Sequence, residues 1–137
     1  MTGEQDVQIA ASQLKLPDPV SIRAWNESDY PEVRSLAFAE GWTTLTDRPE
    51  DGLRAWKHSW PALVVTHQEL VIGFLRAITD GAVTLYVADL LVTPDWRGQG
   101  IGGGLLHVCH ILYPSVRFDL LSIGTAANFY EIGRAHV

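Results

Sequence analysis

Cysteine is nearly absent from this chain of 137 residues, in which Cys109 is the single example. One cysteine excludes an intramolecular disulfide, and with it the small secreted domains that depend on several of them. A run of about 18 apolar residues, the minimum for a membrane-spanning helix, is also missing. The first residues are too polar for a signal peptide. We therefore expect a cytoplasmic protein with no membrane partner.

Positive charge is scarce as well. Ten Lys and Arg residues stand against 16 Asp and Glu, which gives a formal net charge of −6 and a pI near 5.2. Nucleic acid is excluded as a partner, because phosphate binding needs a basic face. A cationic partner is favoured instead. Hydrophobic residues make up 47% of the chain and charged residues only 19%, as in a single globular domain rather than a disordered chain.

The two ends of the sequence differ from its middle. Residues 1–19 are polar, weakly patterned and end in Pro-Asp-Pro, which predicts a flexible N-terminal tail. The last seven residues read EIGRAHV, and a common sequencing-adapter string followed in frame by a stop codon can encode this peptide. We therefore expect residues 131–137 to be a non-native tail on a domain at 20–130 that lacks its C-terminal end. An ordinary frayed terminus is the alternative.

Hydrophobic periodicity predicts the secondary structure between these ends. Expected strands lie at 20–25, 62–66, 70–79, 83–92 and 116–123, and expected helices at 32–40, 50–59, 101–112 and from 125 onward. The order is β-α-α-β-β-β-α-β-α, and short turns join the middle strands into an antiparallel meander. This order predicts an α/β (α+β) fold with a mixed, mostly antiparallel central sheet flanked by helices.

Five glycines lie within residues 98–104, between an expected strand and an expected helix. Glycine inside a helix costs about 1 kcal/mol relative to alanine, so this run needs a reason. Without Cβ atoms a phosphate can reach the backbone N–H groups, and the start of a helix adds unpaired donors and a positive dipole end. The run predicts a diphosphate cradle. On the glycines alone, a flexible turn with close helix–strand packing is an equal alternative.

Three kinds of phosphate-binding loop were compared with this run. A Walker A loop needs Gly-Lys-Ser/Thr, and the run has no lysine. The dinucleotide fingerprint G-x-G-x-x-G is present as Gly98, Gly100 and Gly103, but that motif should follow a first strand directly. Here the motif comes late in the chain, and five residues separate it from the strand before it. The third kind of loop is the one whose residue spacing matches this run.

The pattern Arg97-x-x-Gly100-x-Gly102 resembles the Arg/Gln-x-x-Gly-x-Gly/Ala motif of the GNAT acetyltransferase superfamily. The surrounding DLLVTPDWRGQGIG is similar to that family's strand–loop–helix core, and the element order from residue 20 to residue 130 is similar too. The resemblance implies a GNAT-like fold that lacks its last strands. It also implies an N-acetyltransferase that uses acetyl-CoA as cosubstrate and needs no metal.

The resemblance assigns binding roles to the loop and to the strand before it. That strand should carry a bulge and splay from its neighbour, so that the backbone of Leu91 and Val92 pairs with pantetheine. The loop backbone should bind the coenzyme A pyrophosphate. The residues concerned are Arg97, Gly98, Gln99, Gly100, Ile101, Gly102 and Gly103.

Two residues are candidates for the chemistry. In the family a Tyr on the last helix protonates the leaving thiolate, and Ala126-x-x-Phe129-Tyr130 matches its surroundings, so that Tyr130 is the expected acid. A Tyr that only packs at a helix start is the alternative. Asp89 stands alone in an apolar strand, where it could take the amine proton or anchor an acceptor ammonium ion. A carboxylate satisfied by loop N–H groups is an equal alternative.

The acceptor is expected to be the primary amine of a small cationic molecule, similar to an aminosugar, an aminoglycoside or a polyamine. Acidic residues near the two early helices motivate this class, although a solvated acidic face is the other interpretation. They are Glu40, Asp47, Glu50 and Asp51. Trp42 should line the acceptor entrance. His107 and His110 share a helical face, but a metal site needs a third ligand.

An acyl-CoA-binding module, or an inactive truncated enzyme, is the competing function. Strands missing after residue 130 would leave the edge of the strand at 116–123 unpaired. For this reason we expect a homodimer.

Overall fold

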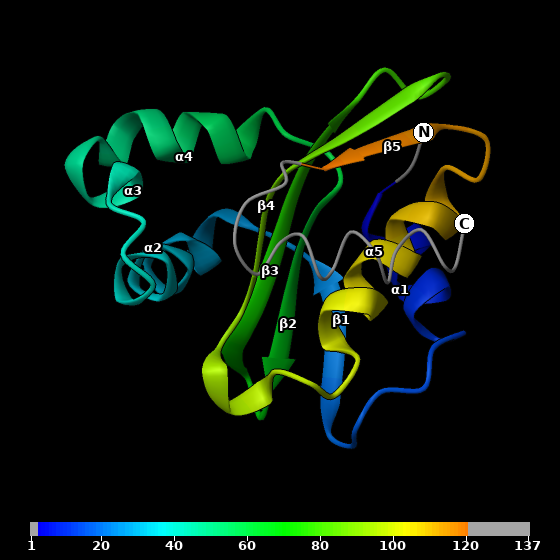
Figure 1. The fold of residues 1–137 in the computed structure, drawn as a ribbon, viewed down its shortest axis with the longest axis horizontal. Helices are drawn as coiled ribbons and strands as arrows, with labels where there is room; N and C mark the ends of the chain where they lie inside the picture. Colours follow the sequence, from blue (N-terminus) through cyan, green and yellow to red (C-terminus); the bar gives the residue numbers. More distant parts are fainter. Residues whose placement is uncertain (1–2, 121–137) are drawn as a thin grey trace.

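The computed structural model describes residues 3–120, which form a five-stranded sheet with helices on both faces (Figure 1). The strands are β1 (Val20–Ala24), β2 (Ala62–His67), β3 (Leu70–Thr79), β4 (Thr84–Val92) and β5 (Arg117–Leu120). The helices are α1 (Glu4–Ala11), α2 (Tyr30–Ala39), α3 (Thr44–Asp47), α4 (Pro49–Lys57) and α5 (Ile101–Leu112). Two 3-10 turns, η1 (Glu27–Asp29) and η2 (Pro94–Trp96), connect them.

The strands lie in the order β1-β2-β3-β4-β5, and the first four are antiparallel. Short turns between β2, β3 and β4 leave no room for a crossover, so these neighbours run in opposite directions. Only β5 is parallel to its neighbour β4, because α5 carries the chain back before β5 begins. The mixed, mostly antiparallel sheet expected from the sequence is therefore confirmed.

Both faces of the sheet are covered. Helices α1 and α5 lie on one face and α2 to α4 on the other (Figure 1). Strand β2 is apolar along most of its length because both of its faces are buried. Leu63 and Val65 join the core under α1 and α5, whereas Ala62 and Val64 join the core under α2 and α4. Side chains alternate along a strand, so a strand buried on both faces has few polar positions.

The expected flexible tail at residues 1–19 is wrong for residues 4–11, which form α1. Val7 and Ala10 are 0% and 1% exposed and pack into the core beside β1 and α5. With so few apolar positions the helix has little periodicity of its own, and contact with the rest of the domain stabilises it. The helix expected at 50–59 also differs, since α4 ends at Lys57 and a separate short α3 precedes it.

The expected strand at 116–123 is described as β5 only as far as Leu120. The helix expected from residue 125, with Tyr130, lies outside the described residues, and so does the expected non-native tail. Within residues 3–120, no helix is long and apolar enough to cross a bilayer.

Strand β4 contains a bulge. Arg76 of β3 pairs with Asp89, but the next residue, Ala77, pairs with Val87, so Ala88 is left without a partner. An extra residue on one strand reverses the facing of the residues that follow it. The bulge therefore decides which side of the sheet receives the side chain of Asp89.

Candidate active site

The glycine-rich turn joins η2 to α5, between the strand and the helix that the sequence predicts. Gly98 and Gly100 have φ values of +78° and +84°, in the left-handed region that other residues rarely adopt. A Cβ atom added at either position would meet nothing within 4 Å. Glycine is thus required here by backbone conformation and not by packing, and the surface of the loop stays bare.

The first turn of α5 offers backbone donors. The first helical hydrogen bond runs from the Gly104 amide to the Gly100 carbonyl at 2.9 Å. The amides of Ile101, Gly102 and Gly103 precede it and have no acceptor within the helix. A bare loop, amides without a partner in the helix and the positive end of a helix dipole suit a pyrophosphate. The described residues therefore fit the group that the resemblance assigns to this turn.

The side chain of Arg97 ties this loop to the rest of the domain. Its Nε donates to the Val92 carbonyl at 2.8 Å, and its guanidinium forms an ion pair with Glu40 at the end of α2. Sequence analysis assigned only a binding role to Arg97. The partner Glu40 lies 57 positions away, and no local pattern links the two residues.

Strand β4 leaves its neighbour before it reaches the loop. Among the described residues, β5 pairs only with Thr84–Val87, and the rest of β4 has β3 alone as partner. Leu91 and Val92 are 3% and 2% exposed and anchor this end of the strand in the two cores. Within residues 3–120, no strand pairs with the β5 side of this end, which is where the resemblance predicts pantetheine.

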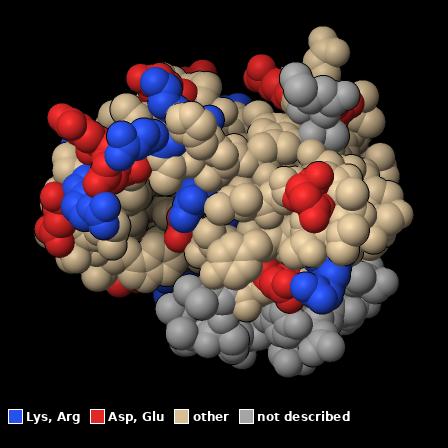
Figure 2. Space-filling view, turned by 90° about the horizontal axis from the view of Figure 1, so that it is seen from above, with Lys and Arg blue, Asp and Glu red and all other residues tan. Residues whose placement is uncertain are grey.

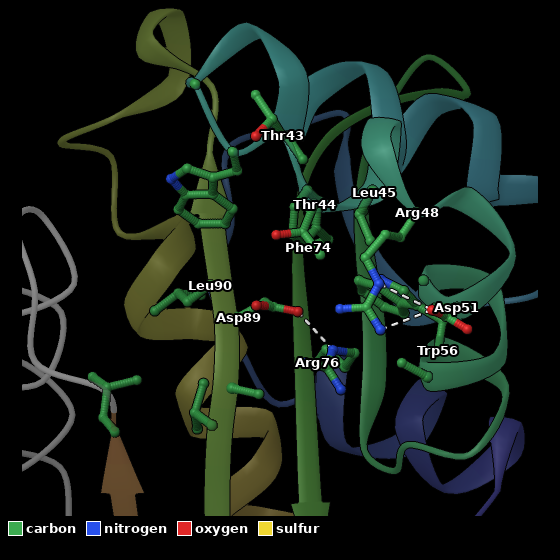
Figure 3. Close-up of a pocket in the computed structure, with 18 residues that line it drawn as sticks. Thr43, Thr44, Leu45, Arg48, Asp51, Trp56, Phe74, Arg76, Asp89 and Leu90 are labelled. Carbon is green, nitrogen blue, oxygen red and sulfur yellow. Dashed lines mark hydrogen bonds and ion pairs between the residues drawn. The ribbon is translucent and has the colours of Figure 1, made fainter.

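A cavity of about 880 Å³ lies between α3, α4 and the sheet (Figure 3). Strands β3 and β4 form its floor with Phe74, Arg76 and Asp89, and Trp42 also lines it. Seen from above, the molecule has a hollow at this place, with basic and acidic side chains close together around it (Figure 2).

The bulge in β4 turns Asp89 toward this cavity. Before the bulge, Leu85 and Val87 face the core under α5; after it, Leu90 and Val92 face that same core. In a regular strand, Asp89 would share the face of Leu85 and Val87 and would be buried under α5. It instead lines the cavity, and its side chain is 31% exposed.

The carboxylate of Asp89 is held by a chain of hydrogen bonds. Arg76 Nε donates to Asp89 Oδ2 at 2.6 Å (Figure 3), and Arg76 Nη1 donates to Ser59 Oγ at 3.1 Å. Ser59 in turn donates to the Ala55 carbonyl of α4 at 2.6 Å. Among the described residues, no group donates to the second oxygen, Asp89 Oδ1. The carboxylate is therefore oriented by the protein and keeps one oxygen for a ligand.

A second charged group lies across the cavity on α4. Asp51 accepts hydrogen bonds from Arg48 Nε at 3.0 Å and from Arg54 Nη2 at 2.5 Å, one on each oxygen. Of these residues, Arg48 and Asp51 line the cavity. Sequence analysis counted Asp51 among the acidic residues that would attract a cation. In the structure two arginines surround this carboxylate, so its negative charge is neutralised within the protein.

Aromatic rings form the apolar wall. Phe74 meets Trp56 and Trp42 edge to face, with ring centroids 5.5 and 6.3 Å apart, and Trp25 packs behind Trp56 at 5.4 Å. Trp56 is 1% exposed, whereas Trp42 is 39% exposed. Edge-to-face contacts hold such rings rigidly. Trp42 therefore presents a partly exposed aromatic surface to the cavity.

Sequence analysis missed Arg76 and Arg48. A signal was present for Arg76, which is the only charged residue in the apolar run of β3. Of the two expected catalytic residues, only Asp89 lies within the described part. His107 and His110 have ring centroids 6.5 Å apart. The described residues contain no group of three or more His, Cys, Asp or Glu side chains that could hold a metal.

Comparison with known proteins agrees with this geometry. Residues 58–131, just over half of the chain, match the profile of the acetyltransferase (GNAT) domain. The fold is similar to that of the GNAT family protein SP0256 from Streptococcus pneumoniae TIGR4, with a TM-score of 0.67, 26% identity and 82% of each chain covered. No curated protein sequence matches the chain closely enough to count as a relative.

Two further solved structures share the fold. A GNAT-family acetyltransferase (xcc2953) from Xanthomonas campestris pv. campestris has a TM-score of 0.67 and 25% identity, covering 87% of this chain and 85% of that one. The PaiA N-acetyltransferase from Thermoplasma acidophilum, solved in complex with coenzyme A, has a TM-score of 0.66 and 15% identity. That likeness covers 85% of this chain and 87% of that one.

Proposed function

Because this chain belongs to the GNAT acetyltransferase family and is an acetyl-CoA-dependent acetyltransferase, we propose that it acetylates the primary amine of a small molecule. The acceptor binds as a cation in the cavity between α4 and the sheet. The observation that carries this proposal is Asp89, which the bulge of β4 turns into an aromatic cavity three residues before the strand ends at Val92. A carboxylate at this place can receive an ammonium group next to the proposed pantetheine path.

The reaction forms a C–N bond and breaks a C–S bond. The bound ammonium group first loses one proton, which frees the nitrogen lone pair, and Asp89 Oδ1 receives that proton directly or through water. The nitrogen then attacks the thioester carbonyl, and its second proton goes to solvent as the amide forms. The coenzyme A thiolate leaves and takes up a proton, for which the family resemblance designates Tyr130. Arg76 touches no reacting atom in this scheme; it positions the Asp89 carboxylate.

Long-range electrostatics supports a cationic acceptor, since the whole chain carries a net charge of −6. Aminosugar-like, aminoglycoside-like and polyamine-like amines belong to this class. Each of these molecules carries an ammonium group that the Asp89 carboxylate can bind.

The proposal is tested by release of free thiol from acetyl-CoA in the presence of a panel of amines. We expect turnover with at least one primary amine and none with the matching tertiary amine, which has no proton to lose. If coenzyme A raises the melting temperature but no amine releases thiol, the chain is an acyl-CoA-binding module and the proposed transfer is wrong.

The role of Asp89 has its own test. Asp89→Asn keeps the shape but removes the charge, and we expect kcat/KM for the amine to fall at least about 100-fold, as for loss of a general base. The matched control is Asp18→Asn, a change at an exposed position in the loop before β1. Equal activity of Asp89→Asn and Asp18→Asn would assign Asp89 to structure alone.

A further inference from the structure

Charge inside the cavity is balanced, although the chain as a whole is acidic. Arg48 and Arg76 line it together with Asp51 and Asp89. Since Arg54 also binds Asp51 from outside the cavity, three guanidinium groups meet two carboxylates at this place. The cavity therefore does not repeat the overall negative charge of the protein.

Both arginines keep N–H donors for which no residue between 3 and 120 supplies an acceptor. Arg48 contacts Asp51 through Nε and Nη2, and Figure 3 shows its remaining amino group directed toward the cavity. Its side chain is 67% exposed. Arg76 contacts Asp89 and Ser59 through Nε and Nη1. The planar guanidinium suits a carboxylate, which it can bind through two parallel N–H donors.

Of the carboxylate oxygens in the described cavity lining, Asp89 Oδ1 is the one that receives no hydrogen bond from the protein. Both oxygens of Asp51 accept from arginines, and Asp89 Oδ2 accepts from Arg76. Asp89 Oδ1 remains for a single ammonium group, among the residues that the structure describes. A second or third ammonium group of the same ligand would lie near Arg48 or Arg76, where like charges repel.

Resting on the proposed acetyl transfer, we infer that the acceptor is an amphoteric amine with one ammonium group, one carboxylate and an apolar, preferably aromatic body, as in an aromatic amino acid. The ammonium group binds Asp89, the carboxylate binds Arg48, and the apolar body lies against Trp42 and Phe74. Polyamines and aminoglycosides are thereby disfavoured among the cationic amines, because they lack the carboxylate and carry extra positive charge.

The inference is tested by calorimetric titration of the full chain, saturated with coenzyme A, with L-phenylalanine, phenethylamine and spermidine. Phenethylamine is L-phenylalanine without its carboxylate, so the pair isolates that group. We expect L-phenylalanine to bind at least about tenfold more tightly than phenethylamine, the effect of one charge-assisted contact. Spermidine should bind more weakly than either. Spermidine binding tighter than L-phenylalanine, or no binding of L-phenylalanine, would overturn the inference.

Two variants assign the carboxylate contact. Arg48→Gln should reduce the affinity for L-phenylalanine to that for phenethylamine, while phenethylamine itself changes by less than about twofold. Arg54→Gln is the matched control, because Arg54 binds the same Asp51 but does not line the cavity. It should preserve the preference for L-phenylalanine. An equal loss in both variants would show that Arg48 acts only through Asp51, and would refute the contact.

Thiol release separates this inference from the proposed function. Turnover of spermidine together with a reversed binding order would leave acetyl transfer intact and refute the amphoteric acceptor. The expected binding order without thiol release from any amine would refute acetyl transfer and leave the selectivity of the cavity intact.

Discussion

Replacing Gly73 by alanine should destabilise the domain by forcing apart the two strands that form the floor of the cavity. Gly73 of β3 pairs with Val92 of β4. A Cβ atom at this position would lie 2.8 Å from the carbonyl oxygen of Leu91. That oxygen belongs to the backbone, so no side-chain rotation can move it away. The strands must separate by several tenths of an ångström, next to the proposed pantetheine path.

Two opposing effects set the magnitude. Overpacking of this kind costs about 1–3 kcal/mol of unfolding free energy. Replacing glycine reduces the entropy of the unfolded chain, which returns about 0.4–1 kcal/mol. The net loss is about 1–2 kcal/mol, which for a domain of this size lowers the melting temperature by about 3–8 °C.

Thermal and urea unfolding of Gly73→Ala measures this loss, and Gly104→Ala in α5 is the matched control. Alanine in a helix gains about 1 kcal/mol over glycine. The nearest atom to the added Cβ is the Cδ2 of Leu16 at 3.3 Å, the end of a side chain that can move. We therefore expect Gly104→Ala to be neutral or stabilising. A melting temperature for Gly73→Ala at or above that of the unsubstituted chain would refute the reasoning.

Three further outcomes are expected. Gly102→Glu should abolish coenzyme A binding, because it puts a negative charge at the start of α5; unchanged affinity by calorimetry would contradict the cradle. Cys109 is 0% exposed, and burial raises its thiol pKa. A thiol reagent should therefore label the unfolded chain but not the native chain, and rapid labelling of the native chain would contradict this. Burial raises the pKa of Asp29, but the hydrogen bonds from Arg23 and the Asn26 amide outweigh it and hold the pKa below 3.8. The stability from this ion pair is therefore complete above pH 3.8 and is lost as the pH falls through the lowered pKa. Asp29→Asn should make the free energy of unfolding, measured in urea, fall less steeply with decreasing pH. An unchanged slope would argue against this role of Asp29.

Much of the fold could be predicted because its determinants are local. The strands β2 to β4 follow from apolar runs separated by turn residues, and α5 from helical spacing after a glycine run. Helix α1, which was not predicted, has two fully buried apolar residues, Val7 and Ala10, and depends on contacts with β1 and α5. Periodicity detects a helix that has an apolar stripe of its own, and α1 is too short to show one.

The candidate site likewise has a part that could be predicted from the sequence and a part that could not. The glycine-rich turn could be predicted, because positive φ at Gly98 and Gly100 and the start of a helix are properties of one short segment. Asp89 could be identified as unusual in its strand, but the pairing of β3 with β4 determines its direction. Its partner Arg76 lies 13 positions away on another strand, and neither strand alone shows that the two would meet.

By itself, the sequence determined the order of the strands, the glycine-rich turn before α5 and the acetyltransferase family, since each depends on residues close together in the chain. Tertiary structure alone decided the character of the acceptor cavity. The bulge at Ala88 turns Asp89 to the cavity, and the helices place Arg48 and Arg54 around Asp51, which cancels the acidic character that the sequence suggests. Facing and charge pairing depend on which strands and helices become neighbours, and that is settled only when the chain folds.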